Sequence, residues 1–230
     1  MNSNALPVVQ HSHRAMRSRL ARLGRLTSAA VVLALSGACA GIVDKPTRAT
    51  QYDFGPGPVS EARPQASTGT ALVLAEVEAA GTLQGSALLY RLGYADDHQL
   101  RPYAQARWSA PPPQLVQQRL RERIGQDRIV LNPGEAAAIG RNAGAAPRVL
   151  RVELEEFSHF FRSPGDSVGL LRLRATLMEN TPGGEKVLAQ RNLVIQRPAP
   201  TADAPGGARA LAAAVDGAAD ELMQWLARQP

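Results

Sequence analysis

One short motif has the spacing of a catalytic serine. Gly165, Ser167 and Gly169 fit the pattern G-x-S-x-G, in which a sharp strand-to-helix turn exposes the serine as a nucleophile. That chemistry needs a histidine base, which comes later in the chain in the usual order of such hydrolases. No histidine follows Ser167, and the residues after it alternate like a β-strand. We therefore predict a turn between two strands and no enzyme; a serine hydrolase acting through Ser167 is the minor alternative.

The chain offers few ligands for a metal ion or a cofactor. His98 follows Asp96 and Asp97, a group typical of a hairpin turn, and the other histidines stand at 11, 13 and 159. The sequence has no cysteine cluster, no calcium-binding loop and no phosphate-binding G-x-x-x-x-G-K-[ST] motif. We expect no metal site, no cofactor and no ATP hydrolysis by this chain.

The only cysteine, Cys39, follows a segment that is typical of a secretory signal peptide. A basic region without acidic residues, with Met16 as an alternative start, leads into the apolar run 26–35, and the small residues 36–38 come directly before the cysteine. The apolar run is shorter than the roughly 20 residues that a spanning helix needs. We therefore predict that residues 1–38 are removed.

The end of this segment resembles the lipobox of bacterial lipoproteins. The resemblance implies that the Cys39 thiol receives a diacylglyceryl group and that the new amino terminus is acylated, for example by palmitate. An ordinary signal peptide and a buried core cysteine are the alternatives, but nothing around Cys39 has a core pattern. The residue after the cysteine is Ala40 and not aspartate, which favours the outer membrane in bacteria that use that sorting rule.

Removal of the signal changes what the net charge means. The full chain carries +6, and five arginines precede Cys39, so the chain from residue 39 onward carries +1. A basic protein often binds nucleic acid or an anionic surface. Because most of the basic excess belongs to the signal, we expect no nucleic-acid partner.

The remaining chain divides into a tether and one domain. Residues 39–70 are rich in Gly, Pro, Ser and Thr and predict a tether with a short docked strand at 52–54. From residue 71 to 230 the pattern predicts a hairpin (88–94 and 100–108), a helix from about 111 to 124 and a short strand at 128–131. Three long alternating strands (150–155, 171–177, 187–195) and a closing helix at 208–228 follow. This order indicates a single α/β or α+β domain with a mixed sheet.

Three groups of side chains allow more than one interpretation. Phe157, Phe160 and Phe161 form either a core cluster, which we favour, or an exposed apolar patch for a partner or a lipid tail. Tyr90 and Trp108 lie on the apolar faces of the hairpin and are expected to be structural. The helix arginines at 119, 121 and 123 are expected to face water, with an interaction surface as the alternative.

The middle of the chain carries a resemblance to a known family. Tyr90-Arg91, Tyr103-Ala104, Arg107-Trp108 and Pro111-Pro112, with Trp225-Leu226 in the closing helix, are similar to the ABC-type transport auxiliary lipoproteins of the PqiC/YmbA-like kind. The resemblance covers roughly residues 52–228. It implies a three-layer sandwich with a mixed β-sheet, resembling anticodon-binding-like folds, and no catalytic residues.

The resemblance also implies a cellular location and a set of partners. Such a protein is lipid-anchored at the periplasmic face of the outer membrane of a Gram-negative bacterium. It would serve an MCE-type lipid transport system, whose partners are an MCE-domain periplasmic protein, an inner-membrane permease and an ATPase. A structural or assembly role in the outer membrane is the alternative. The lipid cargo, the contacting face and the formation of a homo-oligomer stay open.

Overall fold

The structure is a computed structural model, and it describes residues 48–57, 69–136 and 147–229. These residues belong to one compact unit, Arg48–Pro230. Cys39, the predicted signal peptide and most of the predicted tether lie outside the described residues. In the described part of the chain, no helix combines the length and apolar character that crossing a membrane requires.

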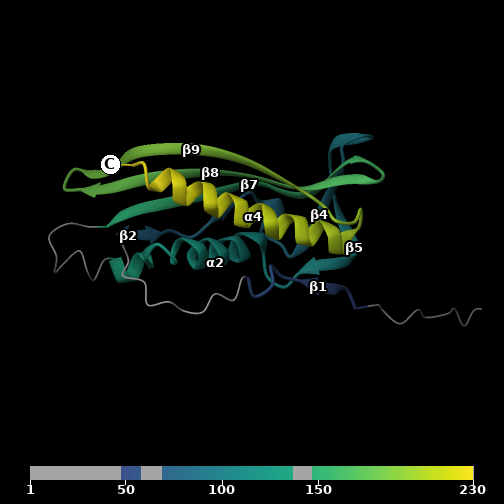
Figure 1. Cartoon of the computed structure of the whole chain (residues 1–230), viewed down its shortest axis with the longest axis horizontal. Helices are drawn as coiled ribbons and strands as arrows, with labels where there is room; N and C mark the ends of the chain where they lie inside the picture. Colours follow the sequence, from purple (N-terminus) through teal and green to yellow (C-terminus); the bar gives the residue numbers. More distant parts are fainter. Residues whose placement is uncertain (1–47, 58–68, 137–146, 230) are drawn as a thin grey trace, which may run out of the picture. The chain divides into compact units, whose positions relative to one another are not determined.

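The unit contains a mixed set of strands and helices (Figure 1). In chain order these are β1 (Thr50–Tyr52), β2 (Gly69–Leu74), β3 (Glu78–Ala79), η2 (Gly81–Leu83), β4 (Ala87–Leu92), β5 (Asp96–Trp108), α2 (Pro112–Ile124), β6 (Arg128–Leu131), β7 (Arg148–Ser163), β8 (Asp166–Thr181), β9 (Gly184–Pro198) and α4 (Ala204–Leu226). The predicted hairpin, first helix, short strand, three long strands and closing helix are all present.

All strands join one mixed sheet that is organised around β7. Along one edge, β7 pairs antiparallel with β8, which pairs antiparallel with β9. Along its other edge, β7 takes β2, β3 and β4 one after another, each parallel to it. Beyond these, β2 pairs with β6, and β4 pairs with β5, whose far edge takes β1. The predicted mixed sheet in a single α+β domain is confirmed.

Apolar and charged side chains alternate along the long strands, which gives the sheet one buried and one solvent-exposed face. In β7, Leu150, Val152 and Leu154 are almost fully buried. The residues between them are charged, and Glu153 accepts a hydrogen bond from Arg174 of β8 at 3.4 Å. Antiparallel sheets commonly have one face on the core and one in water, and this pattern produces that arrangement.

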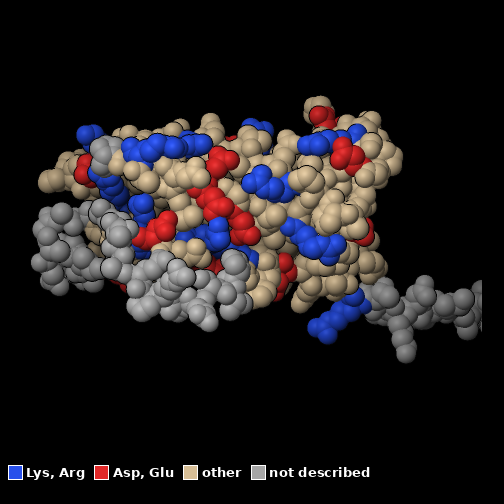
Figure 2. All heavy atoms as spheres, viewed as in Figure 1, with Lys and Arg blue, Asp and Glu red and all other residues tan. Residues whose placement is uncertain are grey.

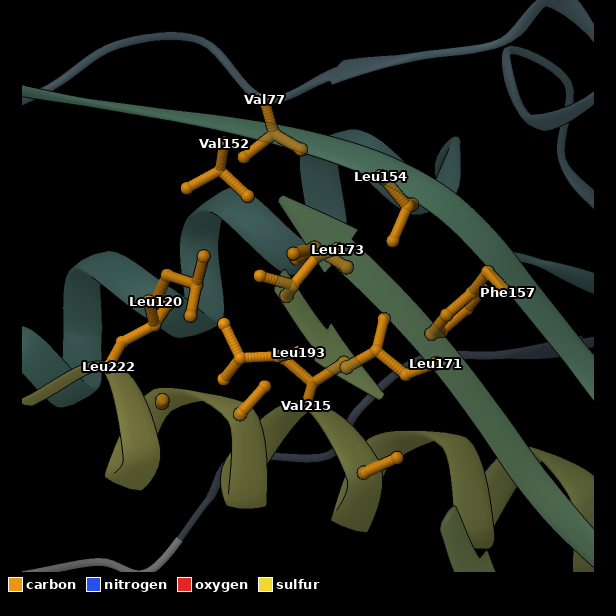
Figure 3. Close-up of a cluster of buried hydrophobic side chains, with 14 of the residues drawn as sticks. Val77, Leu120, Val152, Leu154, Phe157, Leu171, Leu173, Leu193, Val215 and Leu222 are labelled. Carbon is orange, nitrogen blue, oxygen red and sulfur yellow. The ribbon is translucent and has the colours of Figure 1, made fainter. Parts of the chain in front are cut away.

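Both helices cover the buried face. Figure 3 shows Leu120 of α2 and Val215 and Leu222 of α4 in the same cluster as leucines of β8 and β9. The helices also contact each other. Within residues 48–57, 69–136 and 147–229, α2 and α4 lie on this face of β7–β9, and the opposite face carries exposed charges.

The closing helix begins earlier than expected, at Ala204 instead of residue 208. Asp203 caps it, because its side chain accepts a hydrogen bond from the Gly206 backbone N–H at 2.8 Å. The helix then passes very close to β8. An added Cβ at Gly169 would lie 2.5 Å from the backbone of Ala210 and Leu211, so only glycine permits this approach.

Candidate functional site

The structure does not place Ser167 in the setting of a catalytic nucleophile. Ser167 lies inside β8, opposite Phe161 of β7, and is 4% exposed. A nucleophile elbow needs an exposed serine between a strand and a helix, whereas here the strand continues to Thr181. Its Oγ has no hydrogen-bond partner among the described residues. Pro164 and Gly165 form the turn between β7 and β8, so the predicted turn is present but ends before Asp166.

The Asp96–His98 group lies at the start of β5, directly after the turn residues 93–95, so the turn predicted at this group lies three residues earlier. The Asp96 carboxylate accepts a hydrogen bond from the His98 backbone N–H at 3.0 Å, and the His98 Nδ1 lies 2.9 Å from the Asp97 carboxylate. The three potential ligand atoms lie within 4.8 Å of one another. The His98 side chain is 93% exposed, and these local contacts account for the cluster at the start of β5.

A hollow of about 650 Å³ lies beside the start of α2. Glu76 and Glu78 line it together with Gln114 and Gln117, and the Gln117 side chain accepts a hydrogen bond from the Val77 backbone N–H at 3.0 Å. No basic side chain is among its lining residues. Lipid sites are mostly apolar, so this polar, acidic hollow is a poor match for an anionic lipid.

The three phenylalanines separate between the two faces of the sheet. Phe157 and Phe161 are 1% and 8% exposed and belong to the buried side. Phe160 is half-buried, and an added Cβ at Gly93 would lie 2.2 Å from its ring. Phe157 and Phe161 are therefore core residues in this structure, and the alternative of one exposed patch does not fit their burial.

The segment before the predicted domain boundary is docked onto the sheet. Thr50 and Tyr52 of β1 pair with Ala106 and Trp108 of β5, and the Tyr52 C=O accepts a hydrogen bond from the Ser109 N–H at 2.8 Å. Phe54 follows and packs edge-on against Trp108 with ring centroids 5.5 Å apart. A short docked strand is thus present, but at Thr50–Tyr52 and not at 52–54, and the compact unit begins well before residue 71.

A buried arginine holds this docked segment from the other side. The Arg119 guanidinium donates hydrogen bonds to the C=O groups of Phe54 and Gly55, at 2.6 and 3.1 Å. Its Nε lies 3.5 Å from the Asp216 carboxylate of α4, and its side chain is only 3% exposed. We call Phe54, Gly55, Trp108, Arg119 and Asp216 the N-terminal clasp.

Because Arg119 is buried in the clasp, the prediction that it faces water is wrong. Arg119 lies one helical turn after Leu115, which is buried and widens the apolar stripe of α2 toward α4. The docked chain then closes over the guanidinium. Gly55 and Gly57 have φ of 68° and 69°, a left-handed conformation that favours glycine and bends the chain around the arginine.

The other two helix arginines also make contacts within the chain. Arg123 pairs with Asp220 of α4, and Arg121 donates a hydrogen bond to the Asn132 side chain at 2.6 Å. Both are half-buried. Figure 2 shows positive and negative side chains intermingled over this face of the unit. The helix arginines therefore join elements of the domain.

A second buried group lies beneath the start of α4. Tyr90, Tyr103, His159 and Phe161 pack ring against ring, with His159 and Phe161 centroids 4.4 Å apart. A hydrogen bond of 2.9 Å joins the Tyr103 hydroxyl to the His159 Nδ1. An added Cβ at Gly207 would lie 2.4 Å from the same nitrogen. We call these residues the α4 cluster.

Burial sets the ionisation of the α4 cluster. His159 is 0% exposed, and desolvation lowers its pKa from 6.5 to about 4. Desolvation also raises the pKa of Tyr103 above its ordinary value, and the charges of Tyr90 and Asp203 add to this. The Thr201 hydroxyl and the Gly206 N–H hydrogen-bond Asp203 and lower its pKa. The imidazole and the phenol are therefore both neutral near pH 7.

The sequence also identifies the chain by comparison with known families. The family model described as ABC-type transport auxiliary lipoprotein component matches residues 52–223, from β1 into α4. The chain belongs to this family. The match takes in both the N-terminal clasp and the α4 cluster. A search among curated proteins finds no significant relative.

Solved structures share the fold of this auxiliary lipoprotein. Protein XCC0632 from Xanthomonas campestris superposes with a TM-score of 0.60 at 18% identity, covering 77% of this chain and 94% of that one. An uncharacterized protein superposes with a TM-score of 0.55 at 13% identity, covering 78% of this chain and 99% of that one. At these identities the likeness concerns the fold alone.

Proposed function

We propose that this auxiliary lipoprotein is anchored by acylated Cys39 at the periplasmic face of the outer membrane. There it docks the far end of a conduit built by an MCE-domain protein, which an inner-membrane permease and ATPase serve. The single observation that carries the proposal is the family match over residues 52–223. The arrangement of Ser167, buried inside a strand, supports a protein that works by binding.

Crosslinking in membranes tests the proposed partner. Membranes from cells with the tagged full-length protein are crosslinked, solubilised and purified on the tag, and the eluate is analysed by mass spectrometry. We expect an MCE-domain protein to co-purify. Recovery of outer-membrane proteins without any MCE protein would favour the structural or assembly role. Genes for a permease, an ATPase and an MCE protein next to the gene of this protein would be evidence against that role.

The anchor is tested separately. Replacing the only cysteine, as in Cys39→Ala, should release the protein from the membrane fraction or leave an uncut precursor, because stable anchoring needs acyl chains. Intact-mass analysis of the wild-type protein should show acylation at the amino terminus of a chain that begins at Cys39. An unmodified thiol in the mature protein would contradict the proposed anchor.

A further inference from the structure

A groove of about 340 Å³ lies between the docked N-terminal segment and α4. Residues 51–55 form one wall, and the first half of α4 forms the other through Pro205, Ala208, Arg209 and Ala212. Figure 1 shows β1 at the level of this half of α4. Clefts from about 300 Å³ upward are large enough to hold a ligand, and the chemistry of the two walls indicates which kind.

Pairing with β5 leaves the other edge of β1 free among the described residues. The Tyr52 C=O accepts a hydrogen bond from the Ser109 N–H at 2.8 Å, so the backbone groups of Tyr52 point toward β5. Neighbouring residues of a strand direct their N–H and C=O groups to opposite edges, and those of Gln51 therefore point away from β5. Gln51 lines the groove. One wall thus has a backbone donor and a backbone acceptor of the kind that an edge strand presents to another chain.

The N-terminal clasp holds this edge in place before any partner binds. Arg119 donates hydrogen bonds to the C=O groups of Phe54 and Gly55, and the Phe54 ring packs against Trp108. A strand that is already ordered loses less conformational entropy on binding than a flexible segment does. The clasp therefore favours pairing at β1.

The wall formed by α4 is mostly small and apolar. Pro205, Ala208 and Ala212 lie three or four positions apart and so share one flank of the helix. Their short side chains leave room for the side chains of a segment laid along β1. Arg209 on the same wall is exposed. Its side chain forms no ion pair among the described residues, and its hydrogen bond to the Thr201 Oγ is 3.5 Å long, so its charge is available to a ligand.

We propose that the groove binds an extended segment of a partner protein, which pairs with the free edge of β1 as an added strand. Main-chain hydrogen bonds to Gln51 hold the segment. Every second side chain of the segment is apolar and faces the α4 wall. An acidic side chain pairs with Arg209, since the Asp53 carboxylate on the other wall already accepts a hydrogen bond from the Gly55 N–H at 2.8 Å. The proposal goes beyond the proposed function, because it locates a contact surface whichever envelope protein supplies the segment.

Photo-crosslinking in cells tests the site. A benzophenone amino acid replaces Gln51 in the full-length protein, or Ala213 as a control, since Ala213 is exposed on α4 but does not line the groove. Mass spectrometry identifies the crosslinked residues. We expect position 51 to crosslink one short segment of another protein, and position 213 not to crosslink that segment. No crosslink at position 51, crosslinks there only to lipid, to this chain or to a second copy of it, or equal crosslinking at position 213 would overturn the inference.

Variants of the groove then test the contacts. The identified segment is made as a fluorescent peptide, and its Kd for the purified full-length protein is measured by fluorescence anisotropy. Gln51→Pro removes the outward N–H, which an edge strand tolerates, and Ala212→Gln narrows the groove. Both should raise the Kd roughly tenfold, whereas the control Ala213→Gln should leave it unchanged. If Gln51→Pro fails to fold, Ala212→Gln decides alone, and an unchanged Kd in the folded groove variants would overturn the inference.

Backbone methylation of the peptide tests strand pairing itself. Two peptides carry N-methyl groups on alternate residues, one in each of the two registers, and only one register blocks the N–H groups that face β1. We expect binding to be lost in that register alone. Equal Kd values for the two methylated peptides would overturn strand addition. If the segment comes from a protein without an MCE domain, the groove is supported and the proposed partner is wrong.

Discussion

The N-terminal clasp and the α4 cluster both bury an ionisable side chain, but they do so in different ways. Arg119 is 2% exposed and has oxygen atoms of the docked chain and of Asp216 around it. His159 is 0% exposed, and its ring has Tyr103 as its partner at Nδ1, while Nε2 has none among the described residues.

The difference shows how a fold can tolerate a buried polar group. Arginine keeps its charge at any ordinary pH, so it needs acceptors when it is buried. The clasp supplies the C=O groups of Phe54 and Gly55 at Nη2 and the Asp216 carboxylate near Nε, while Nη1 has no hydrogen-bond partner among the described residues. Histidine can lose its charge instead, and desolvation does this by lowering the pKa of His159 to about 4. The α4 cluster should therefore be sensitive to acid between pH 6.5 and about 4 through His159, whereas the Arg119 guanidinium does not change its charge in this range.

The largest expected loss of stability is at Trp108, against which the Phe54 ring of the clasp packs. Trp108 is 1% exposed and packs against both Phe54 and Phe157. Trp108→Ala should lower the free energy of unfolding by about 3–5 kcal/mol, because it leaves a cavity in the core. Chemical denaturation measures this. An unchanged midpoint would mean that the ring is not part of the core.

We expect acid to lower the stability of the folded protein through His159 of the α4 cluster. The unfolded imidazole binds a proton near pH 6.5, but the folded one does so only near pH 4. Between these values the unfolded state binds more protons, so stability falls as pH falls, by up to roughly 3 kcal/mol. Asp203 loses its contribution only below its ordinary pKa of 3.8, so the slope above pH 4 belongs to His159.

Urea unfolding at a series of pH values tests this assignment. His159→Gln should flatten the slope between pH 6.5 and 4. His98→Gln is the matched control, because it replaces an exposed histidine outside the α4 cluster, and it should leave the slope unchanged. A slope that survives in the folded His159 variant would assign the acid sensitivity to another group. A clasp variant such as Phe54→Ala should lower stability equally at every pH in this range.

A smaller effect is expected where α4 meets the histidine. Gly207→Ala places a methyl group 2.4 Å from the His159 Nδ1, and overpacking of this kind costs about 1–3 kcal/mol. Gly217→Ala on the same helix is the matched control, because its methyl group would meet the end of the exposed Arg197 side chain. That side chain can move, so Gly217→Ala should be neutral or stabilising. Similar losses in both variants would contradict the tight fit at His159.

The clasp and the α4 cluster also show which features of the structure could be predicted from the sequence. Alternation in β7 and β8 and the periodic stripes of α2 and α4 depend on neighbouring residues, so these elements were predictable. The clasp depends on Phe54 and Arg119, which are 65 positions apart. Leu115 was the one local signal, because it extends the buried stripe of α2 to Arg119.

The α4 cluster was hidden for the same reason. Tyr103 and His159 are 56 positions apart, and nothing in the sequence around either residue indicates that they meet. The phenylalanine run was correctly interpreted as core for Phe157 and Phe161. The layer arrangement, with both helices on one face, also needed the tertiary contacts of α2 with α4.

The smallest expected effect concerns Ser167, at the edge of the α4 cluster. Its Oγ is buried and has no partner among the described residues, so Ser167→Ala removes an unsatisfied group. A hydroxyl in this state contributes little to stability, and its removal should change the free energy of unfolding by about 0 to 1 kcal/mol, with stabilisation as the favoured sign. Envelope-integrity assays should not distinguish the variant from wild type, and a serine-reactive probe should not label the wild-type protein. Labelling that disappears in a folded Ser167→Ala variant with a null phenotype would replace the binding function with a hydrolase.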